Sequence, residues 1–298
     1  MSLRISYMLS QEENGGSAED SRQPGEKKAD RRKGEKKSMK TRIISGCVML
    51  PLLAVVWLGG YWLMAAAFIV GIIGLRELYN GFETMGVKPC REIAYVATAA
   101  LYLFNILWKE NLNLLMLWAV VCTMACLIYG FKVNERKTED TTSTLFGLMY
   151  VVFFSYHIVL IDQSEHRILI WLVFLAAFGT DIMAYFTGMA LGKHKLCPNL
   201  SPKKSIEGAV GGVLGSVVFC GLFGYFLGGG MLWECVIIGF VGSIAAQLGD
   251  LSASAFKRQM GIKDYGNLIP GHGGILDRFD SVLFTAPLIY YTMQLILY

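Results

Sequence analysis

The chain has 298 residues, of which 54% are hydrophobic and 17% are charged, and its mean hydropathy is +0.47. Soluble domains carry about 25% charged residues, so this composition excludes a water-soluble monomer and predicts an all-α, polytopic integral membrane protein. The formal net charge of +4 is too small to suggest a nucleic-acid partner.

Residues 1–38 differ in composition from the rest of the chain. They are rich in Lys, Arg, Asp and Glu and contain few large apolar side chains, so they cannot bury enough apolar surface to offset the entropy of ordering. We predict a disordered, charged tail over 1–38 and a membrane-embedded domain over 39–298. Met39 directly precedes the first apolar stretch, and two interpretations stay open: the tail belongs to the native protein, or it is an upstream extension before a start at Met39.

Apolar stretches long enough to cross a bilayer recur through 39–298. A helix needs about 20 apolar residues to cross a hydrocarbon core of about 30 Å. The polar residues gather in two loops, 191–205 and 250–280, so we expect the first five spans to be scaffold and the C-terminal half to be active. The nine predicted transmembrane helices are 43–58, 61–78, 93–108, 112–130, 143–161, 168–190, 206–227, 231–249 and 281–297.

The Lys and Arg residues of the loops indicate an orientation. Cytoplasmic loops of membrane proteins carry an excess of Lys and Arg. With the N-terminus in the cytoplasm, only Lys109 and Arg167 among the loop cations after the tail fall on the other side. We predict a multi-pass protein of the cell (inner) membrane, surrounded by membrane lipids, with both polar loops cytoplasmic and the C-terminus outside.

Asp181 lies inside the predicted span 168–190. A carboxylate at this depth costs about 2.5–3.5 kcal/mol on insertion scales, so it should face a polar cavity or a partner side chain. A hydrogen bond between two helices is the simpler interpretation. The polar neighbours Thr180 and Tyr185 favour a functional site.

The segment Ser201-Pro202-Lys203-Lys204-Ser205 directly precedes the span 206–227. Ser201 or Ser205 could cap this helix, and its free N-terminal amides beside Lys203 and Lys204 would form an anion site. The alternative is a cationic loop that touches anionic lipid headgroups. Small residues four apart predict close helix packing in the same span, and they are Gly208, Gly212 and Ser216.

Three carboxylates, with cations between them, follow the span 231–249. They are Asp250, Asp277 and Asp280, and the last two would share a face of a helix. Aspartates hold Mg²⁺, the metal bridges phosphate oxygens, and Lys or Arg neutralises the remaining charge. This stretch therefore predicts a metal-dependent nucleotide site. Its other polar residues are Ser254, Lys257, Arg258, Lys263, Asp264, His272 and Arg278.

Two of these residues also have a structural interpretation. Arg278 could form a bridge with Asp277 or Asp250, and His272 could be a hydrogen-bonding residue of a loop. The chain contains no Walker A loop and no zinc-ligand spacing.

The stretch from Ser254 to Asp280 resembles the C-terminal signature of the phosphatidate cytidylyltransferases, or CDP-diglyceride synthases. The resemblance extends upstream through Asp181, the segment 201–208 and Gly249-Asp250, is weak over the first five spans, and leaves out the tail. The matching residues are Ser254-Ala255-Phe256-Lys257-Arg258, Lys263-Asp264-Tyr265-Gly266 and Leu268-Ile269-Pro270-Gly271-His272-Gly273-Gly274-Ile275-Leu276-Asp277-Arg278-Phe279-Asp280.

The resemblance implies a Mg²⁺-dependent nucleotidyltransferase of phospholipid biosynthesis. An oxygen of phosphatidic acid would attack the α-phosphorus of CTP, forming CDP-diacylglycerol and pyrophosphate. Asp250 and Asp280 would be metal ligands, Asp277 a ligand or a neighbour of one, and Asp181 would lie in the same cavity. A homodimer is a further expectation. The implied substrate-binding residues are Ser201, Lys203, Lys204, Ser254, Lys257, Arg258, Lys263, Asp264, His272 and Arg278.

Two other functions stay open. A CTP-dependent lipid kinase of the polyprenol or phytol type would share the fold and the CTP site but transfer the γ-phosphate to an alcohol, and the complete signature argues against it. An ion-coupled transporter using Asp181 and Asp250 would predict inverted repeats with broken helices, and the sequence shows no convincing internal repeat.

Overall fold

The structure, a computed structural model, describes residues 51, 53–108, 112–268 and 273–298. The described chain is mostly helical. The predictions for the tail 1–38, for Met39, for most of the span 43–58 and for His272 fall outside these residues.

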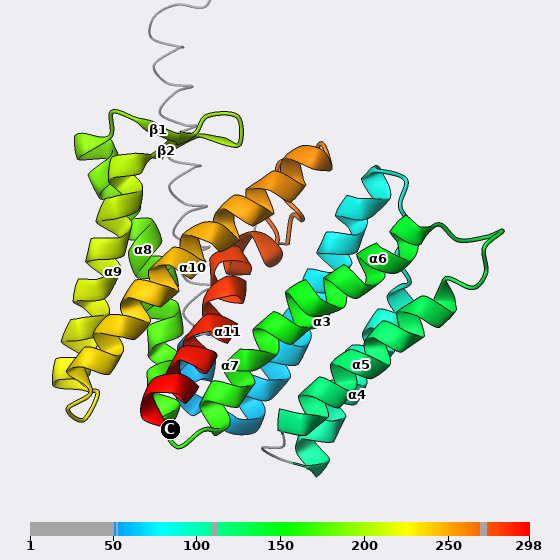
Figure 1. Ribbon diagram of the computed structural model, residues 1–298, viewed down its shortest axis with the longest axis horizontal. Helices are drawn as coiled ribbons and strands as arrows, with labels where there is room; N and C mark the ends of the chain where they lie inside the picture. The colour runs from blue at the N-terminus through cyan, green and yellow to red at the C-terminus, as the bar shows by residue number, and fades with distance from the viewer. Residues whose placement is uncertain (1–50, 52, 109–111, 269–272) are drawn as a thin grey trace, which may run out of the picture. The chain divides into compact units, whose positions relative to one another are not determined.

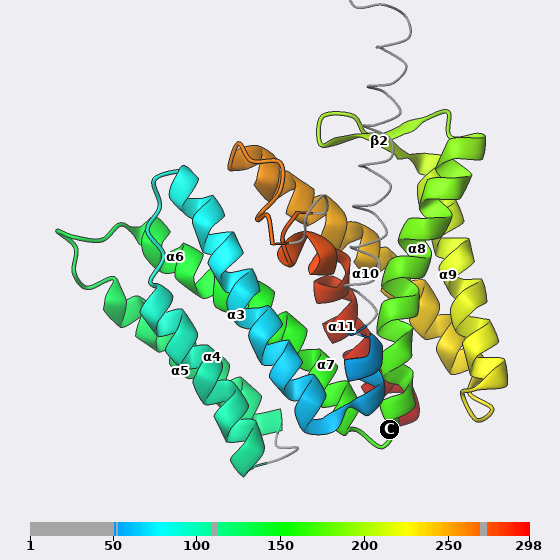
Figure 2. The same cartoon turned by 180° about the vertical axis from the view of Figure 1, so that it is seen from behind.

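The first half of the described chain is a set of packed helices (Figure 2). The long span predicted at 143–161 is one continuous helical rod, but its middle turn is a π-helix, η1. Residues 53–58 are helical, and Gly59 separates them from α3; Gly59 and Gly60 both have positive φ. The elements are α3 (Gly60–Thr84), α4 (Arg91–Leu107), α5 (Leu112–Tyr129), α6 (Thr138–Gly147), η1 (Leu148–Phe153) and α7 (Phe154–Gln163).

The second half contains the longest helices and a small hairpin (Figure 1). Strands β1 and β2 pair antiparallel, with Lys195 opposite Ser205. The all-α prediction therefore needs a correction, because residues 191–205 are not simply a loop. Pro202 lacks the N–H that a helix interior requires, and it favours extended backbone here. The elements are η2 (Arg167–Leu169), α8 (Ile170–Leu191), β1 (Lys195–Cys197), β2 (Ser201–Ser205), α9 (Ile206–Phe226), α10 (Leu232–Gln259) and α11 (Leu276–Leu297).

Helix length and composition identify candidate membrane spans. A further apolar helix, Asn113–Tyr129, is shorter, so the nine predicted spans exceed the number that the described residues support by these criteria. The five helices of the described chain that are long and apolar enough are Gly60–Thr84, Thr138–Gln163, Arg167–Leu191, Ile206–Phe226 and Leu232–Gln259.

The predicted polar loop 250–280 is wrong at both ends. Helix α10 continues to Gln259 and α11 already begins at Leu276, so only residues 260–275 connect them. The apolar pattern explains the longer α10, because Ala253 is fully buried and Phe256 packs against the same core. Asp250, Ser254, Lys257, Arg258, Asp277, Arg278 and Asp280 therefore lie on helix rather than on a loop, whereas Lys263 and Asp264 lie in the connection.

Small residues bring α8, α9 and α10 close together, as predicted. A Cβ atom at Gly212 would lie 3.0 Å from the Thr180 carbonyl oxygen, and one at Gly208 would lie 2.8 Å from that of Ala184. Ser216 is fully buried and its Oγ donates a hydrogen bond to the Gly239 carbonyl at 3.3 Å. Because the backbones approach this closely, side chains of all three helices can reach one cavity.

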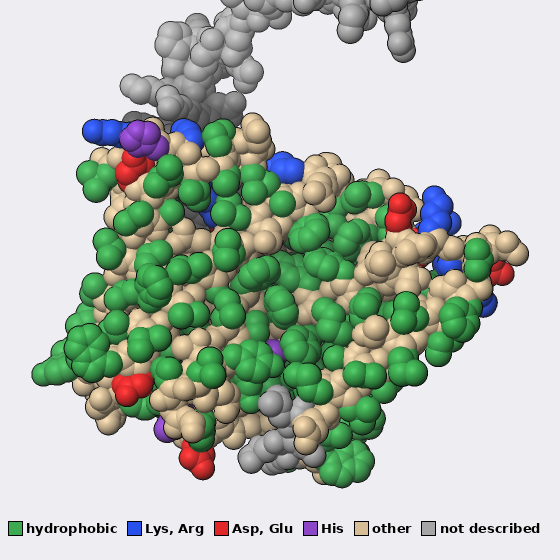
Figure 3. Space-filling view, viewed as in Figure 1, with side chains coloured by type: hydrophobic (Ala, Val, Ile, Leu, Met, Phe, Trp, Pro, Cys, Tyr) green, Lys and Arg blue, Asp and Glu red, His purple; other side chains and the backbone are tan. Residues whose placement is uncertain are grey.

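The chain connections divide between two ends. The β1–β2 hairpin and the α3–α4 and α5–α6 connections lie toward one end, whereas the α7–α8 and α9–α10 connections and the C-terminus lie toward the other (Figures 1 and 2). The space-filling view shows hydrophobic side chains over the middle of this face and Lys and Arg toward the hairpin end (Figure 3). This distribution fits a membrane protein whose cations gather on one side.

Candidate functional site

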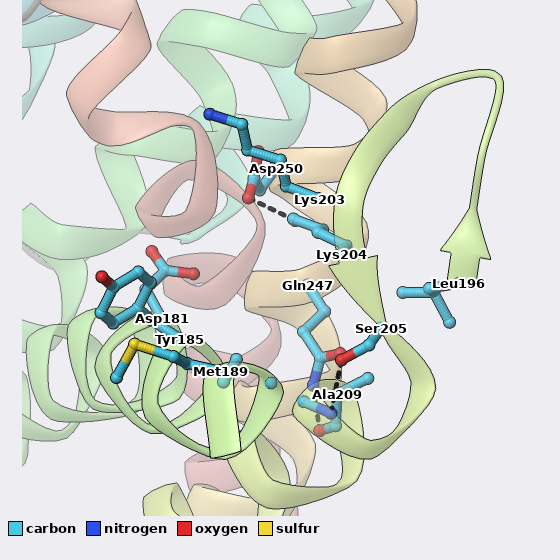
Figure 4. Close-up of a pocket in the computed structure, with 13 residues that line it drawn as sticks. Asp181, Tyr185, Met189, Leu196, Lys203, Lys204, Ser205, Ala209, Gln247 and Asp250 are labelled. Atoms are coloured by element: carbon cyan, nitrogen blue, oxygen red, sulfur yellow. Dashed lines mark hydrogen bonds and ion pairs between the residues drawn. The ribbon is translucent and has the colours of Figure 1, made fainter. Parts of the chain in front are cut away.

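A cavity of about 390 Å³ lies between the hairpin and the hairpin-side ends of α8, α9 and α10 (Figure 4). It brings together two regions that the sequence predicted separately, Asp181 of α8 and the cationic segment before α9. The lining residues are Asp181, Ala184, Tyr185, Gly188, Met189, Leu196, Lys203, Lys204, Ser205, Gly208, Ala209, Gln247 and Asp250.

Strand β2 supplies the cations of this cavity. Lys203 and Lys204 both line it, and Lys204 Nζ donates to Asp250 Oδ2 (Figure 4). Ser205 is the N-cap of α9, and its Oγ accepts a hydrogen bond from Gly208 N at 3.1 Å. Of the two predicted caps, Ser205 is therefore the correct one, whereas Ser201 is the first residue of β2 and lies outside the described lining.

Glu207 holds the hairpin against the start of α9. Its carboxylate accepts hydrogen bonds from Lys193 N at 3.1 Å and from His194 N at 3.2 Å, and it pairs with His194 Nδ1 at 2.6 Å. This carboxylate thus fixes the residues just before β1, the strand that pairs with the one carrying Lys203 and Lys204. The helix N-terminus and both cations form the combination that binds anions in proteins.

Asp181, Asp250 and Asp280 come from α8, α10 and α11 and lie within electrostatic reach of one another. Ser281 links two of them, because its Oγ donates to Asp181 Oδ2 at 3.4 Å and its N–H donates to Asp280 Oδ1 at 2.8 Å. Asp280 is only 8% exposed. We call these three carboxylates the acid cluster.

Gly249 allows α10 and α11 to meet at the acid cluster. A Cβ atom at this position would lie 2.6 Å from the Asp280 carbonyl oxygen, so any larger residue would separate the helices that carry Asp250 and Asp280. One turn further along α10, Ser254 Oγ lies 3.5 Å from Asp250 Oδ1. The predicted convergence of Asp181, Asp250 and Asp280 is thus seen in the structure.

Asp277 has a different environment from Asp280. Its Oδ1 accepts a hydrogen bond from Lys257 Nζ at 2.8 Å, and its Oδ2 accepts from Tyr265 N at 2.8 Å and Gly274 N at 2.9 Å. These contacts tie the connection 260–275 to α10 and α11. The alternative interpretation, a bridge from Arg278 to Asp277 or Asp250, is not what the described residues show, because Lys257 pairs with Asp277 and Lys204 pairs with Asp250.

Arg278 instead acts electrostatically on Asp181, and its buried Nε atom has no hydrogen-bond partner among the described residues. Its guanidinium therefore keeps donor capacity toward the acid cluster. Arg258, Lys263 and Asp264 are exposed at the end of α10 and in the connection that follows, and the described cavity lining does not include them.

Tyr265 anchors the connection outside the membrane-spanning helices. Its side chain is buried, and its hydroxyl donates to the Ala253 carbonyl at 3.3 Å. Burial, reinforced by Asp277 and Asp280, raises the pKa of the Tyr265 phenol above its ordinary value. The phenol therefore remains a neutral donor across the physiological pH range.

Glu77 is a residue that the sequence analysis missed. It lies on α3 and is 6% exposed, and it accepts hydrogen bonds from Ile275 N at 3.0 Å and Leu276 N at 2.8 Å. It thereby binds the free amides that begin α11, next to the acid cluster. Helix α3 of the predicted scaffold thus contacts the start of the helix that carries Asp277 and Asp280. The argument applied to Asp181, a carboxylate inside an apolar helix, applies equally to Glu77.

Gln247 also lines the cavity, and its Nε2 donates to the Ala209 carbonyl at 3.1 Å. It precedes Asp250 by three residues on α10, so both side chains lie on one helix face. This three-residue spacing from Asp250 is the sequence feature from which Gln247 could have been predicted as a site residue.

The sequence of the chain is similar to those of known proteins. A model of the cytidylyltransferase family matches residues 40–296. The chain is 34% identical over 260 residues to the phosphatidate cytidylyltransferase of Staphylococcus haemolyticus, which covers 84% of this chain and 95% of that protein.

Two further relatives carry the same name. The phosphatidate cytidylyltransferase of Staphylococcus saprophyticus is 35% identical over 260 residues, and that of Staphylococcus aureus is 35% identical over 254 residues. In both comparisons the alignment covers 84% of this chain and 95% of the relative.

Proposed function

Because the chain belongs to the cytidylyltransferase family, we propose that it is a membrane-embedded phosphatidate cytidylyltransferase. It transfers the cytidylyl group of CTP to phosphatidic acid, giving CDP-diacylglycerol and pyrophosphate. The observation that carries this proposal is the cavity at which Asp181 and Asp250 of the acid cluster meet the cationic strand β2. The name shared by relatives 34–35% identical to the chain specifies the substrates.

The cavity chemistry suits transfer between two phosphate-bearing substrates. A phosphatidate oxygen is already an anion, so the reaction needs little general-base catalysis and depends on positioning and charge neutralisation. Lys203 and Lys204 stand at the N-terminus of α9 on one side, and Lys257 and Arg278 stand near the acid cluster on the other. In this proposal, these four cations position the phosphate groups of CTP and phosphatidic acid for the transfer and neutralise part of their charge.

A magnesium ion fits the carboxylates of the cluster. The described residues contain no group of three His, Cys, Asp or Glu side chains arranged to hold a metal. Mg²⁺ does not require one, because it typically uses one or two carboxylates and completes its shell with water and substrate phosphates. Asp250 and Asp280 would be those ligands. The partners of Asp250 are the side chains of Lys204 and Ser254, whereas Asp277 is also held by two backbone amides, those of Tyr265 and Gly274. When bound, the ion would neutralise charge on the reacting phosphates.

The proposal also covers the membrane location, the topology and the oligomeric state of the protein. We place residues 39–298 in the cell (inner) membrane with nine spans, the N-terminus and the active-site segments in the cytoplasm, and the charged tail 1–38 outside the domain. The cation-rich end of the described chain supports this orientation (Figure 3), and the family match from residue 40 supports the boundary. A homodimer is part of the same proposal.

The products and the metal requirement test this function. Purified protein in detergent–lipid micelles receives phosphatidic acid and CTP with or without Mg²⁺, and CDP-diacylglycerol and pyrophosphate are quantified. We expect both in equal amounts, only with Mg²⁺. Formation of CDP with a lipid alcohol, while phosphatidic acid stays unreacted, would instead identify a CTP-dependent lipid kinase.

A further inference from the structure

Tyr150 carries a buried hydroxyl with no hydrogen-bond partner among the described residues. The side chain is 4% exposed and lies in the π-helix η1, Leu148–Phe153. Leaving a buried donor unpaired costs about 1–3 kcal/mol. A π-helical turn inside an α-helix is also uncommon and often marks a functional position.

Aromatic packing fixes the Tyr150 ring without involving its hydroxyl. The ring stacks on Phe146 of α6 at 5.3 Å between centroids, and it contacts Phe256 of α10 at 6.3 Å and Phe284 of α11 at 6.1 Å. A phenylalanine would make the same contacts. Packing therefore explains the ring but leaves the hydroxyl without a role.

The groups around the hydroxyl point to that role. The ionisable residues that act on it electrostatically are Tyr265, Asp280, Asp250 and Asp277. Asp277 already accepts hydrogen bonds on both oxygens, and Asp250 is paired with Lys204. Phe284, which contacts the Tyr150 ring, lies one turn beyond Asp280 on α11, and its Cβ would lie 3.1 Å from a Cβ atom at Gly249, the neighbour of Asp250. The O–H donor therefore lies beside the acid cluster, and it comes from the half of the chain that the sequence assigned to scaffold.

We propose that the Tyr150 hydroxyl donates a hydrogen bond to a phosphate oxygen of a reactant bound at the acid cluster. A phosphate brings several strong acceptors into a region where the existing ones are largely occupied. This inference rests on the proposed function, and the acceptor belongs either to the nucleotide or to the lipid phosphate.

Tyr150→Phe tests the inference, with Tyr102→Phe as the matched control. Tyr102 is also buried, and its hydroxyl makes no hydrogen bond of good geometry among the described residues. Its neighbours are Phe68, Tyr156 and Ser155, and the acid cluster does not act on it. Steady-state rates are measured with CTP varied at saturating phosphatidic acid and then with phosphatidic acid varied at saturating CTP. Thermal unfolding in detergent is measured for both variants.

We expect Tyr150→Phe to unfold at the temperature of the parent protein and to lose about tenfold or more in kcat/KM, the usual effect of a lost hydrogen bond to a charged acceptor. A loss confined to one varied substrate assigns the acceptor to that substrate, and a loss in both assigns it to the reacting phosphates. Tyr102→Phe should stay within about twofold of the parent. Rates within twofold for Tyr150→Phe, or an unfolded variant, would overturn the proposal.

A parent protein that forms no CDP-lipid would refute the proposed function rather than this inference. Binding of pyrophosphate to the parent and to Tyr150→Phe, measured by calorimetry, then decides the role of Tyr150. Binding about tenfold weaker in the variant supports a phosphate contact, and equal binding or none to either protein excludes it.

Discussion

Asp277 and Asp280 lie three residues apart on α11 but have different partners. Asp277 holds Lys257 and two backbone amides of the connection 260–275, whereas Asp280 belongs to the acid cluster. Their spacing predicted a shared helix face. It did not predict which of the two carboxylates would accept hydrogen bonds from Lys257 and the backbone, because that depends on the path of the connection 260–275.

Substitution of each carboxylate by its amide should separate these roles. Asp280→Asn should lower the initial rate by about 100-fold or more, because it removes charge where phosphates and metal are held, and it should leave the unfolding temperature nearly unchanged. The control Glu135→Gln changes a carboxylate that is 67% exposed, and it should leave both quantities unaltered. A fully active Asp280→Asn protein would contradict the site.

Asp277→Asn should act mainly on stability. It leaves the buried ammonium of Lys257 without a counter-charge, and removing one partner of a buried pair costs about 3–5 kcal/mol. The measurement is the unfolding temperature in detergent, read together with the initial rate. A stable but inactive Asp277→Asn protein would instead indicate a direct role in the reaction.

At the scale of elements, the start of α11 depends on Glu77 of α3. This contact joins residues about 200 positions apart, and the partners of Glu77 are backbone amides. No pattern of residue types in the sequence therefore predicts it. The sequence predicted both helices but not that one caps the other. Likewise, α10 extends past the predicted end because polar residues near a membrane surface do not terminate a helix.

Glu77→Gln should weaken the connection and the site together. A neutral cap loses about 1 kcal/mol or more relative to a carboxylate at a helix N-terminus, and the displaced start of α11 should lower the reaction rate. Glu83→Gln is the control, because the Glu83–Arg91 pair is partly exposed and contributes about 0–1 kcal/mol. The two unfolding temperatures and rates are compared. Equal behaviour of both variants would exclude the capping role.

The α8–α9 contact should tolerate no large residue. Gly212→Leu places a side chain where the Thr180 carbonyl lies 3.0 Å from a Cβ atom, so we expect loss of about 1–3 kcal/mol or more and a disrupted cavity. Val210→Leu on the same helix is 55% exposed and should be neutral. The sequence predicted this small-residue face but not that α8 is its partner. An unchanged unfolding temperature for Gly212→Leu would contradict the packing.

At the scale of the whole molecule, the hairpin and the α5–α6 connection lie toward the same end, and the α9–α10 connection lies toward the other (Figures 1 and 2). Loop charge alone predicted this division. The number of spans was harder to predict, because apolar residues that face protein and apolar residues that face lipid look alike in a sequence.

Protease sites inserted after Asn134 and after Gly229 should report the orientation. We expect cleavage after Asn134 only in inverted membrane vesicles, because Lys132, Arg136 and Lys137 predict a cytoplasmic position for that connection. Cleavage after Gly229 should occur only from the outside. The reverse pattern would show that the loop cations do not set the orientation of this protein.

The most direct test of cytidylyl transfer follows the phosphorus atoms. Purified protein with phosphatidic acid and Mg²⁺ receives CTP labelled with ³²P at the α position in one reaction and at the γ position in another. We predict that the α label enters CDP-diacylglycerol and that the γ label appears only in pyrophosphate. A γ label transferred to lipid, with CDP as the other product, would contradict the account.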